Sequence, residues 1–158
     1  MTLQLSWSGT QSLVLTLLVV LALAPTGRAQ NRAGTNEQPG SAMEQLLSGR
    51  GRQMIGRSVS LSHVAVQNLT QDDIVWVGNT ASQSVLVMLQ PSVNPIDAQG
   101  NPTPIAAGDQ VRVTGHVIAS PNAQVLQSWG VSPADAARVE RQGAVLQAVT
   151  FEVIARNR

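Results

Sequence analysis

The stretch Gly108-Asp-Gln-Val-Arg-Val-Thr-Gly-His-Val-Ile-Ala119 decides the fold of this chain. Three valines, Val111, Val113 and Val117, recur at even spacing, and polar side chains fall between them. This alternation predicts a strand with one buried face. The Gly-Asp pair that opens the stretch is a turn signal, and Gly115 marks a point where the strand bends or bulges.

A second stretch, Gly56-Arg-Ser-Val-Ser-Leu-Ser-His63, repeats the alternation with Val59 and Leu61 on the buried face. After Ser62-His63 the apolar residues change parity, because Val64 comes next. A β-bulge, which re-aims the side chains that follow it, explains the change. A long first strand bent in this way is expected to pair with both halves of a small barrel.

Three more segments have strand patterns, separated by turns and loops. We expect strands at residues 74–77, 85–89 and 145–153, turns at 68–73 and 78–84, and a loop at 91–108 with a tight turn at 97–100. Four prolines exclude a helix from that loop. In the last strand Val145, Val149, Phe151 and Val153 are expected to share the buried face.

The clearest helix signal lies between the last two strands. Ser132 is the expected N-cap, Pro133 occupies the first helical position, the helix runs to Gln142, and Gly143 suits the left-handed position after its end. A shorter helix is expected after the capping box Ser41-Ala-Met-Glu44, with Gly49 as its stop.

The first residues predict export. Leu13 to Ala24 is an apolar run of the length found in signal peptides, and small residues flank Arg28 before an expected cut after Ala29. The alternative is an uncleaved membrane anchor, for which the run is short. We therefore expect a signal peptide at 1–29, a flexible spacer with a short helix at 30–54 and a barrel domain at 55–158. The mature protein is expected to be periplasmic or secreted, with no stable membrane span.

Composition narrows the classes of function. The chain has no cysteine, which excludes a disulfide framework and a lipid anchor on cysteine. It has 10 basic and 9 acidic residues, and Arg28 leaves with the expected leader. A neutral mature protein lacks the electrostatic footprint of a general nucleic-acid binder, so nucleic acid is not an expected partner.

Taken together, Gly56-Arg-Ser-Val-Ser-Leu, Trp76-Val77, Gly108-Asp-Gln-Val-Arg-Val-Thr-Gly115 and Leu146-Gln-Ala148 resemble exported bacterial OB-fold proteins, over residues 55–155. The resemblance implies a mainly β fold, a five-stranded Greek-key OB-fold barrel. OB folds usually carry a helix between strands three and four. Here the helix is expected between strands four and five, where it enlarges one loop beside the usual ligand face.

The sequence predicts no enzyme, no cofactor and no metal site. His63 and His116 lie on strands expected to be neighbours, but two histidines without a cysteine or a third histidine do not make a zinc site. Serines occur in no activating context such as Gly-x-Ser-x-Gly. An Asp97, Gln99 and Asn101 calcium site is disfavoured because the loop lacks the full acidic pattern.

The hypothesis that remains is a non-catalytic binding or interaction module of the cell envelope. Its ligand face is expected on strands one to three, with Arg112, His116 and Trp129 as candidate contacts and Trp76 in the core. An oligosaccharide, a peptide or an envelope protein is the expected partner. The alternatives are a structural or stress-protective envelope protein and, less favoured, a single-stranded nucleic-acid binder. A polar groove beside Trp129 favours binding, whereas a helix sealing the face favours the structural role.

Overall fold

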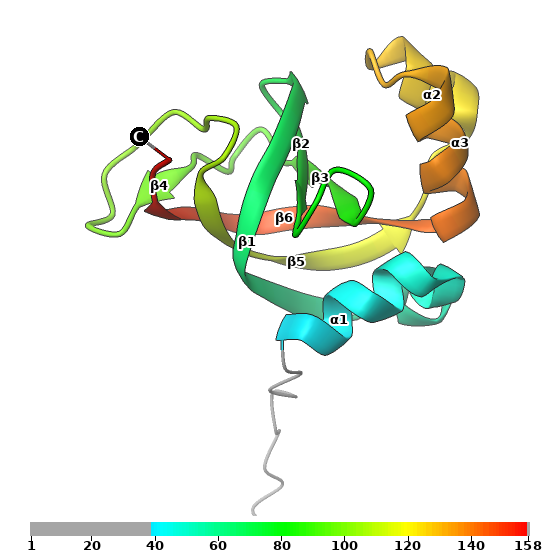
Figure 1. Cartoon of the computed structure of the whole chain (residues 1–158), viewed down its shortest axis with the longest axis horizontal. Helices are drawn as coiled ribbons and strands as arrows, with labels where there is room; N and C mark the ends of the chain where they lie inside the picture. The colour runs from blue at the N-terminus through cyan, green and yellow to red at the C-terminus, as the bar shows by residue number, and fades with distance from the viewer. Residues whose placement is uncertain (1–38, 158) are drawn as a thin grey trace, which may run out of the picture. The chain divides into compact units, whose positions relative to one another are not determined.

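The computed structural model describes residues 39–157, so the expected signal peptide and the first part of the expected spacer lie outside the described residues. In chain order the elements are α1 (Pro39–Gln45), η1 (Leu46–Arg50), η2 (Gly51–Met54), β1 (Ser58–Gln71), β2 (Ile74–Gly78), β3 (Ser84–Leu89), β4 (Ile96–Asp97), β5 (Gln110–Ala119), α2 (Ala123–Ser128), α3 (Pro133–Gln142) and β6 (Ala144–Ala155) (Figure 1).

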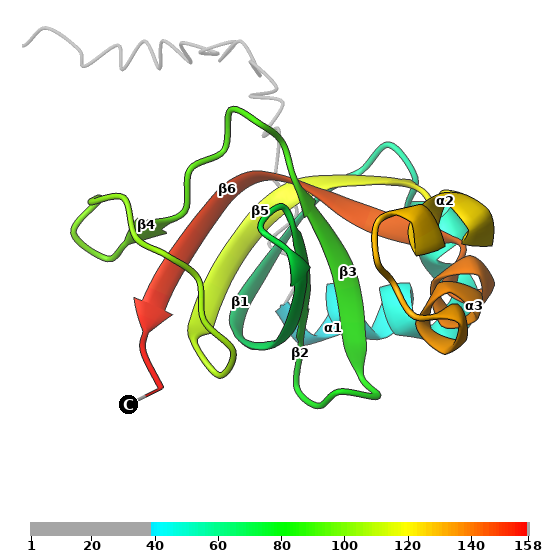
Figure 2. The same ribbon diagram turned by 90° about the horizontal axis from the view of Figure 1, so that it is seen from above.

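The fold is a closed mixed barrel of five strands, as Figure 2 shows from above. The strands follow one another around the barrel in the order β1-β2-β3-β6-β5, and β5 returns to β1. All neighbours are antiparallel except β3 and β6, which run parallel and close the barrel. The expected mainly β barrel is therefore confirmed.

The bend expected in the first strand is confirmed. The register of β1 against β5 shifts between Ser62 and Val64, and His63 between them has a φ of 57°. Before the shift β1 pairs with β5 alone, and from Ala65 onward it also pairs with β2. The bulge therefore lets one strand serve two parts of the barrel wall.

Three details of the strands differ from expectation. The turn expected at 68–73 is shorter than predicted, because β1 continues to Gln71 and only Asp72 and Asp73 join it to Ile74 in a tight hairpin. Val149 is exposed because it is an extra residue in β6, where the register against β5 shifts. That bulge also puts Val145 on the outer face, whereas Phe151 and the residues after it keep the expected inner parity.

The place of the helix in the strand order needs correction. The sequence predicts it between strands four and five, but it lies between β5 and β6. The reason is the short strand β4, which pairs with β6 and was not predicted. α3 has the expected ends, since Ser132 caps its first turn and Gly143 adopts φ 75°. A second helix, α2, precedes it, and the side chain of Asn122 caps this helix.

The remaining long loop contains the tight turn expected at 97–100. Asp97 accepts hydrogen bonds from the backbone N–H groups of Gln99 and Asn101 at 2.9 and 2.8 Å. The Asn101 bond is the main cause that lowers the pKa of Asp97. In a turn of this kind the carboxylate accepts hydrogen bonds from the backbone of the turn.

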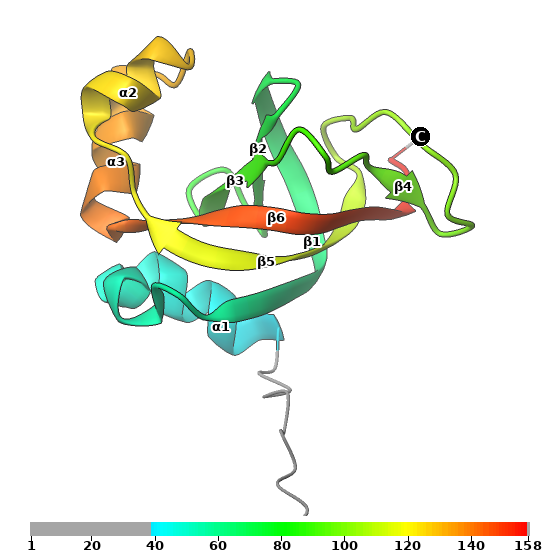
Figure 3. The ribbon, with the colours of Figure 1, turned by 180° about the vertical axis from the view of Figure 1, so that it is seen from behind.

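Two apolar clusters hold the molecule together. The inner cluster fills the barrel with one face of every long strand, centred on Leu61, Val113 and Phe151. The second cluster lies on the outer face of β2 and β3, where Trp76 and Leu86 pack against Leu126 and other side chains of α2 and α3. The two helices therefore cover the outer face of these two strands. Figure 3 shows α2 and α3 lying together at one side of the barrel.

The N-terminal helical segment packs against one end of the barrel. Met43, Leu46 and Met54 are buried in the inner cluster, and Gly49 ends the helix with a φ of 76°, as expected. The compact unit therefore extends upstream of Ile55, the residue where the sequence placed the domain boundary.

Within residues 39–157, no helix is both long enough and apolar enough to cross a membrane.

The bulge in β6 predicts that Gly115 is intolerant of a side chain. A Cβ added to Gly115 would overlap the carbonyl oxygen of Gln147 on β6. We expect Gly115→Ala to lower the free energy of unfolding by about 1–3 kcal/mol, the usual cost of overpacking. Gly56→Ala is the control, because a Cβ at that position has open space and the only cost is the strain of a φ of 84° in an L residue. Urea denaturation measures both, and a smaller loss for Gly115→Ala than for Gly56→Ala would contradict this account.

Candidate functional site

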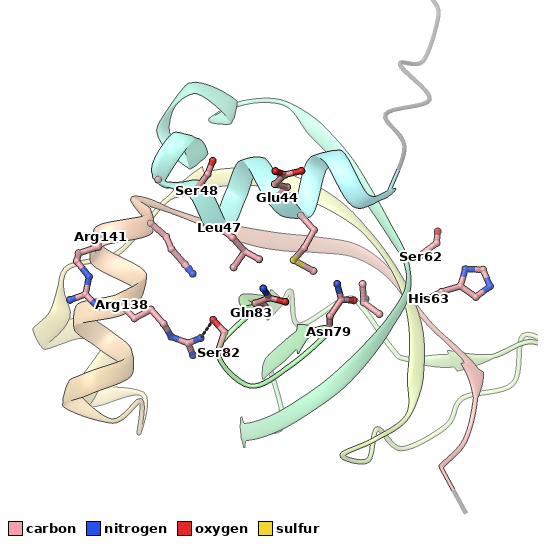
Figure 4. A pocket seen from close by; sticks show the side chains of 14 residues that line it. Glu44, Leu47, Ser48, Ser62, His63, Asn79, Ser82, Gln83, Arg138 and Arg141 are labelled. Atoms are coloured by element: carbon pink, nitrogen blue, oxygen red, sulfur yellow. Dashed lines mark hydrogen bonds between the residues drawn. The ribbon is translucent and has the colours of Figure 1, made fainter.

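A pocket of about 790 Å³ opens at one end of the barrel. Its walls are the helical segment α1–η1, the bulge of β1, the turn between β2 and β3, and the last turns of α3 (Figure 4). The volume falls in the range of small-molecule sites in proteins. Four segments that are distant in the sequence therefore meet around one cavity.

Three apolar side chains line part of the pocket: Met43 and Leu47 from the N-terminal helical segment, and Val64 from β1. Met43 and Val64 are buried, and Leu47 is half-buried. The sequence pattern places Met43 and Leu47 four residues apart, on the helix face that turns toward the barrel. The pocket thus has an apolar surface that is continuous with the inner core.

The turn between β2 and β3 supplies two amides. Asn79 and Gln83 are exposed, and their side chains point into the pocket (Figure 4). The turn is fixed by its own backbone, because the N–H of Asn79 donates to the carbonyl of Gln83 at 3.2 Å and the N–H of Gln83 donates to that of Thr80 at 3.0 Å. The backbone that carries both side chains is therefore held by a short, internally bonded loop.

Arg138 on α3 ties that turn to the helix. Its guanidinium donates to the carbonyl of Ala81 at 2.9 Å and to the hydroxyl of Ser84 at 3.2 Å. It also pairs with Asp135 at 3.0 Å and lies over the ring of Trp76, 4.5 Å from the centroid. Opposite charge and a ring face both stabilise a guanidinium. Arg138 is therefore engaged by the fold, and its charge is compensated.

The next turn of α3 carries two groups that the fold leaves unused. Arg141 is exposed and has no ion-pair or hydrogen-bond partner among residues 39–157. Gln142 is only 6% exposed, and its Nε2 donates to the carbonyl of Ser84 at 3.5 Å. Its Oε1 is buried without a partner in the described part of the chain. Leaving a buried acceptor unpaired costs about 1–3 kcal/mol.

The ionisable groups at the pocket carry charges of both signs. With Arg138 paired to Asp135, the groups that face open solvent are Arg141 on α3 and Glu44 on α1. Figure 4 shows these two on different elements at the rim, with the pocket between them. The site therefore offers one cation, one anion, several amides and an apolar wall, which are groups for binding a polar ligand with an apolar part.

His63 is at the rim of the pocket, but its imidazole points away from the cavity, on the outer side of β1 (Figure 4). No group of three His, Asp or Glu residues lies close enough to hold a metal within the described range. The register also separates the two histidines, because His116 pairs with Ser58, five residues before His63.

The residues predicted from the sequence lie elsewhere. Arg112 and His116 are exposed on the outer face of β5, where Arg112 pairs with Glu152 at 2.8 Å and Nδ1 of His116 is 3.0 Å from the hydroxyl of Ser58. Trp129 caps the C-terminus of α2 and packs against the outer cluster. None of the three lines the pocket.

Sequence reasoning missed the pocket residues because they converge only in three dimensions. One signal was available: Arg138 and Arg141 are three residues apart on a well-capped helix, so they share a face. The sequence contains no sign that Arg138 is held by the β2–β3 turn and by Trp76.

Comparison with known proteins finds no matching family model and no matching curated protein. The geometry of the chain itself therefore carries the functional argument.

The two arginines of α3 are expected to differ in their effect on stability. Arg138→Gln removes bonds to the β2–β3 turn and the contact with Trp76, so we expect the free energy of unfolding to fall by about 1–3 kcal/mol. Arg141→Gln is the matched control, one turn away, and is expected to change stability by less than about 0.5 kcal/mol. Chemical denaturation of both variants checks this, and equal losses would show that the assignment is wrong.

Proposed function

We propose that this protein is an exported, non-catalytic OB-fold binding module that holds a small polar ligand in the pocket at the barrel end. The observation that carries the proposal is the pocket itself, about 790 Å³ in volume, with amide, guanidinium and carboxylate groups contributed by separate elements around an apolar wall. Such convergence of polar groups on a concave, partly apolar surface is typical of ligand sites.

The strand order supports the OB-fold assignment. A five-stranded Greek-key barrel of this class binds ligands on the face of its second and third strands and on the loops beside it. Here β3 pairs with β6 in parallel and closes the barrel, which gives a strand order compatible with that class. The outer face of β2 and β3 is covered by α2 and α3, so the ligand site moves to the barrel end, where the same α3 contributes its last turn.

The absence of catalysis is also part of the proposal. Serines 48, 62 and 82 line the pocket, but the nearby imidazole of His63 faces away from them (Figure 4). Activation of a hydroxyl requires a base within hydrogen-bond reach. This geometry favours binding over turnover.

A second candidate function is a structural or stress-protective protein of the envelope. One observation favours it: α2 and α3 cover the outer face of β2 and β3, and Trp129 packs against the same apolar cluster. Nucleic acid is the least supported partner, because two of the three aromatic residues in the described region, Trp76 and Phe151, are buried and cannot serve as stacking platforms.

Export is supported by the apolar run at 13–24 and the small residues before Gln30. We expect the protein recovered from the periplasm or medium to begin at Gln30. Intact-mass spectrometry of protein expressed with its own N-terminus checks this, and an intact Met1 in a membrane fraction would instead support an uncleaved anchor.

The binding role predicts that filling the pocket abolishes ligand stabilisation. Gln83→Trp puts a bulky ring into the cavity from an exposed position, whereas Ala81→Trp puts the same ring on the same turn outside it. We expect ligands from a panel of peptides, amino-acid derivatives, oligosaccharides and inorganic anions to raise the Tm of the parent protein and of Ala81→Trp by several degrees. Gln83→Trp should show no shift. A panel that leaves the parent Tm unchanged, or shifts all three proteins equally, would favour the structural role.

A further inference from the structure

The pocket contains an acceptor that the fold has buried without satisfying. Gln142 lines the cavity, its side chain is more than nine-tenths buried, and its Oε1 has no partner in residues 39–157. The amide is oriented by the bond from its Nε2 to Ser84, which leaves the oxygen for another group. A buried carbonyl oxygen in this position is complementary to an N–H or O–H donor of a ligand.

The neighbouring residue supplies the charge. Arg141 follows the fully bonded Arg138 by one helical turn and has no partner of its own in the described chain. A guanidinium presents a planar fork of donors that matches a carboxylate with two parallel hydrogen bonds. The available charge on α3 is therefore suited to a carboxylate, and the next residue along the helix offers an acceptor for a hydrogen-bond donor.

The opposite wall is suited to an apolar group. Met43, Leu47 and Val64 line it, and two of them are buried. The described residues of the lining include no Trp, Tyr or Phe ring on which a sugar could stack, and Trp76 lies beneath the guanidinium of Arg138. The chemistry of the pocket thus favours an aliphatic side chain over a saccharide.

We propose that the pocket binds the free C-terminal residue of a peptide, with an aliphatic side chain. In such a residue one carbon atom carries all three complementary groups. The α-carboxylate pairs with Arg141, the last peptide N–H donates to Oε1 of Gln142, and the side chain packs against Met43 and Leu47. This inference rests on the proposed function, because it names the ligand class of the same pocket. Glu44 at the rim disfavours a further acidic residue upstream.

Isothermal titration calorimetry with matched peptides tests the inference. The probes are acetyl-Ala-Ala-Leu with a free carboxylate, the same peptide as its C-terminal amide, and the free acid with an N-methyl group on the last peptide nitrogen. We expect the amide and the N-methyl peptide each to bind at least about tenfold more weakly than the free acid.

Two variants assign these losses to their partners in the protein. In Arg141→Gln the difference between acid and amide should disappear, and Arg57→Gln, an exposed arginine outside the pocket, should retain it. In Gln142→Met the free acid and the N-methyl peptide should bind equally. Circular dichroism checks that each variant is folded. If Gln142→Met does not fold, the N-methyl peptide still tests the same hydrogen bond from the ligand side.

The outcomes separate this inference from the function on which it rests. Equal binding of acid and amide by the parent protein, or an unchanged difference in Arg141→Gln, would overturn the peptide proposal. Binding of a neutral oligosaccharide or of inorganic phosphate that Gln83→Trp abolishes would overturn the ligand class while the pocket keeps its binding role. If no probe of any class binds, both proposals fail.

Discussion

One strand has to serve two neighbours, and the bend at His63 that allows this is the constraint on which the rest of the structure depends. β1 pairs with β5 along its first half and with β2 along its second, and the bulge between Ser62 and Val64 turns it from one to the other. His63 is the one non-glycine residue in the described range with a positive φ, a conformation that costs about 1–2 kcal/mol in an L residue. The closed hydrogen-bonding of the barrel holds it there. Pairing of β1 with β2 begins only after the bend, at Ala65, and residues 62–64 at the bend line the pocket together with α1 and the β2–β3 turn.

The helical insertion has two consequences that follow from the same contacts. α2 and α3 bury Trp76, Leu86 and their neighbours, which removes the outer face of β2 and β3 as a surface for ligands. The same packing brings the last turn of α3 against the β2–β3 turn, where Arg138 bonds to its backbone. Arg141 and Gln142, which follow on the same helix, then line the pocket. The packing of α2 and α3 thus both covers the outer face of β2 and β3 and forms one wall of the pocket.

Much of the fold could be predicted from the sequence, because its signals are local. The alternation of Val111, Val113 and Val117, the parity change at His63 and the caps of α3 each reflect steric or hydrogen-bonding rules that act within a few residues. The errors arose where tertiary pairing decides. Val149 is apolar and in phase with Val145, yet the bulge opposite Gly115 expels it to solvent. The pairing of β4 with β6 joins a proline-rich loop to a distant strand, and no local pattern encodes it. The candidate site was not predictable for the same reason. Its side chains come from four segments, and the unpaired oxygen of Gln142 exists only once its surroundings are known.

The central claim is that ligands bind at the barrel end between α1 and α3 and not on the outer face of β5. Chemical-shift mapping by NMR, with the protein labelled with ¹⁵N and titrated with an acetylated tripeptide bearing a free carboxylate, tests this most directly. The account predicts saturable shifts concentrated on Glu44, Gln83 and the last turn of α3, with the signals of Arg112 and His116 unmoved. Shifts centred on Arg112 and His116 would contradict the claim and return the site to candidate contacts that the sequence first indicated.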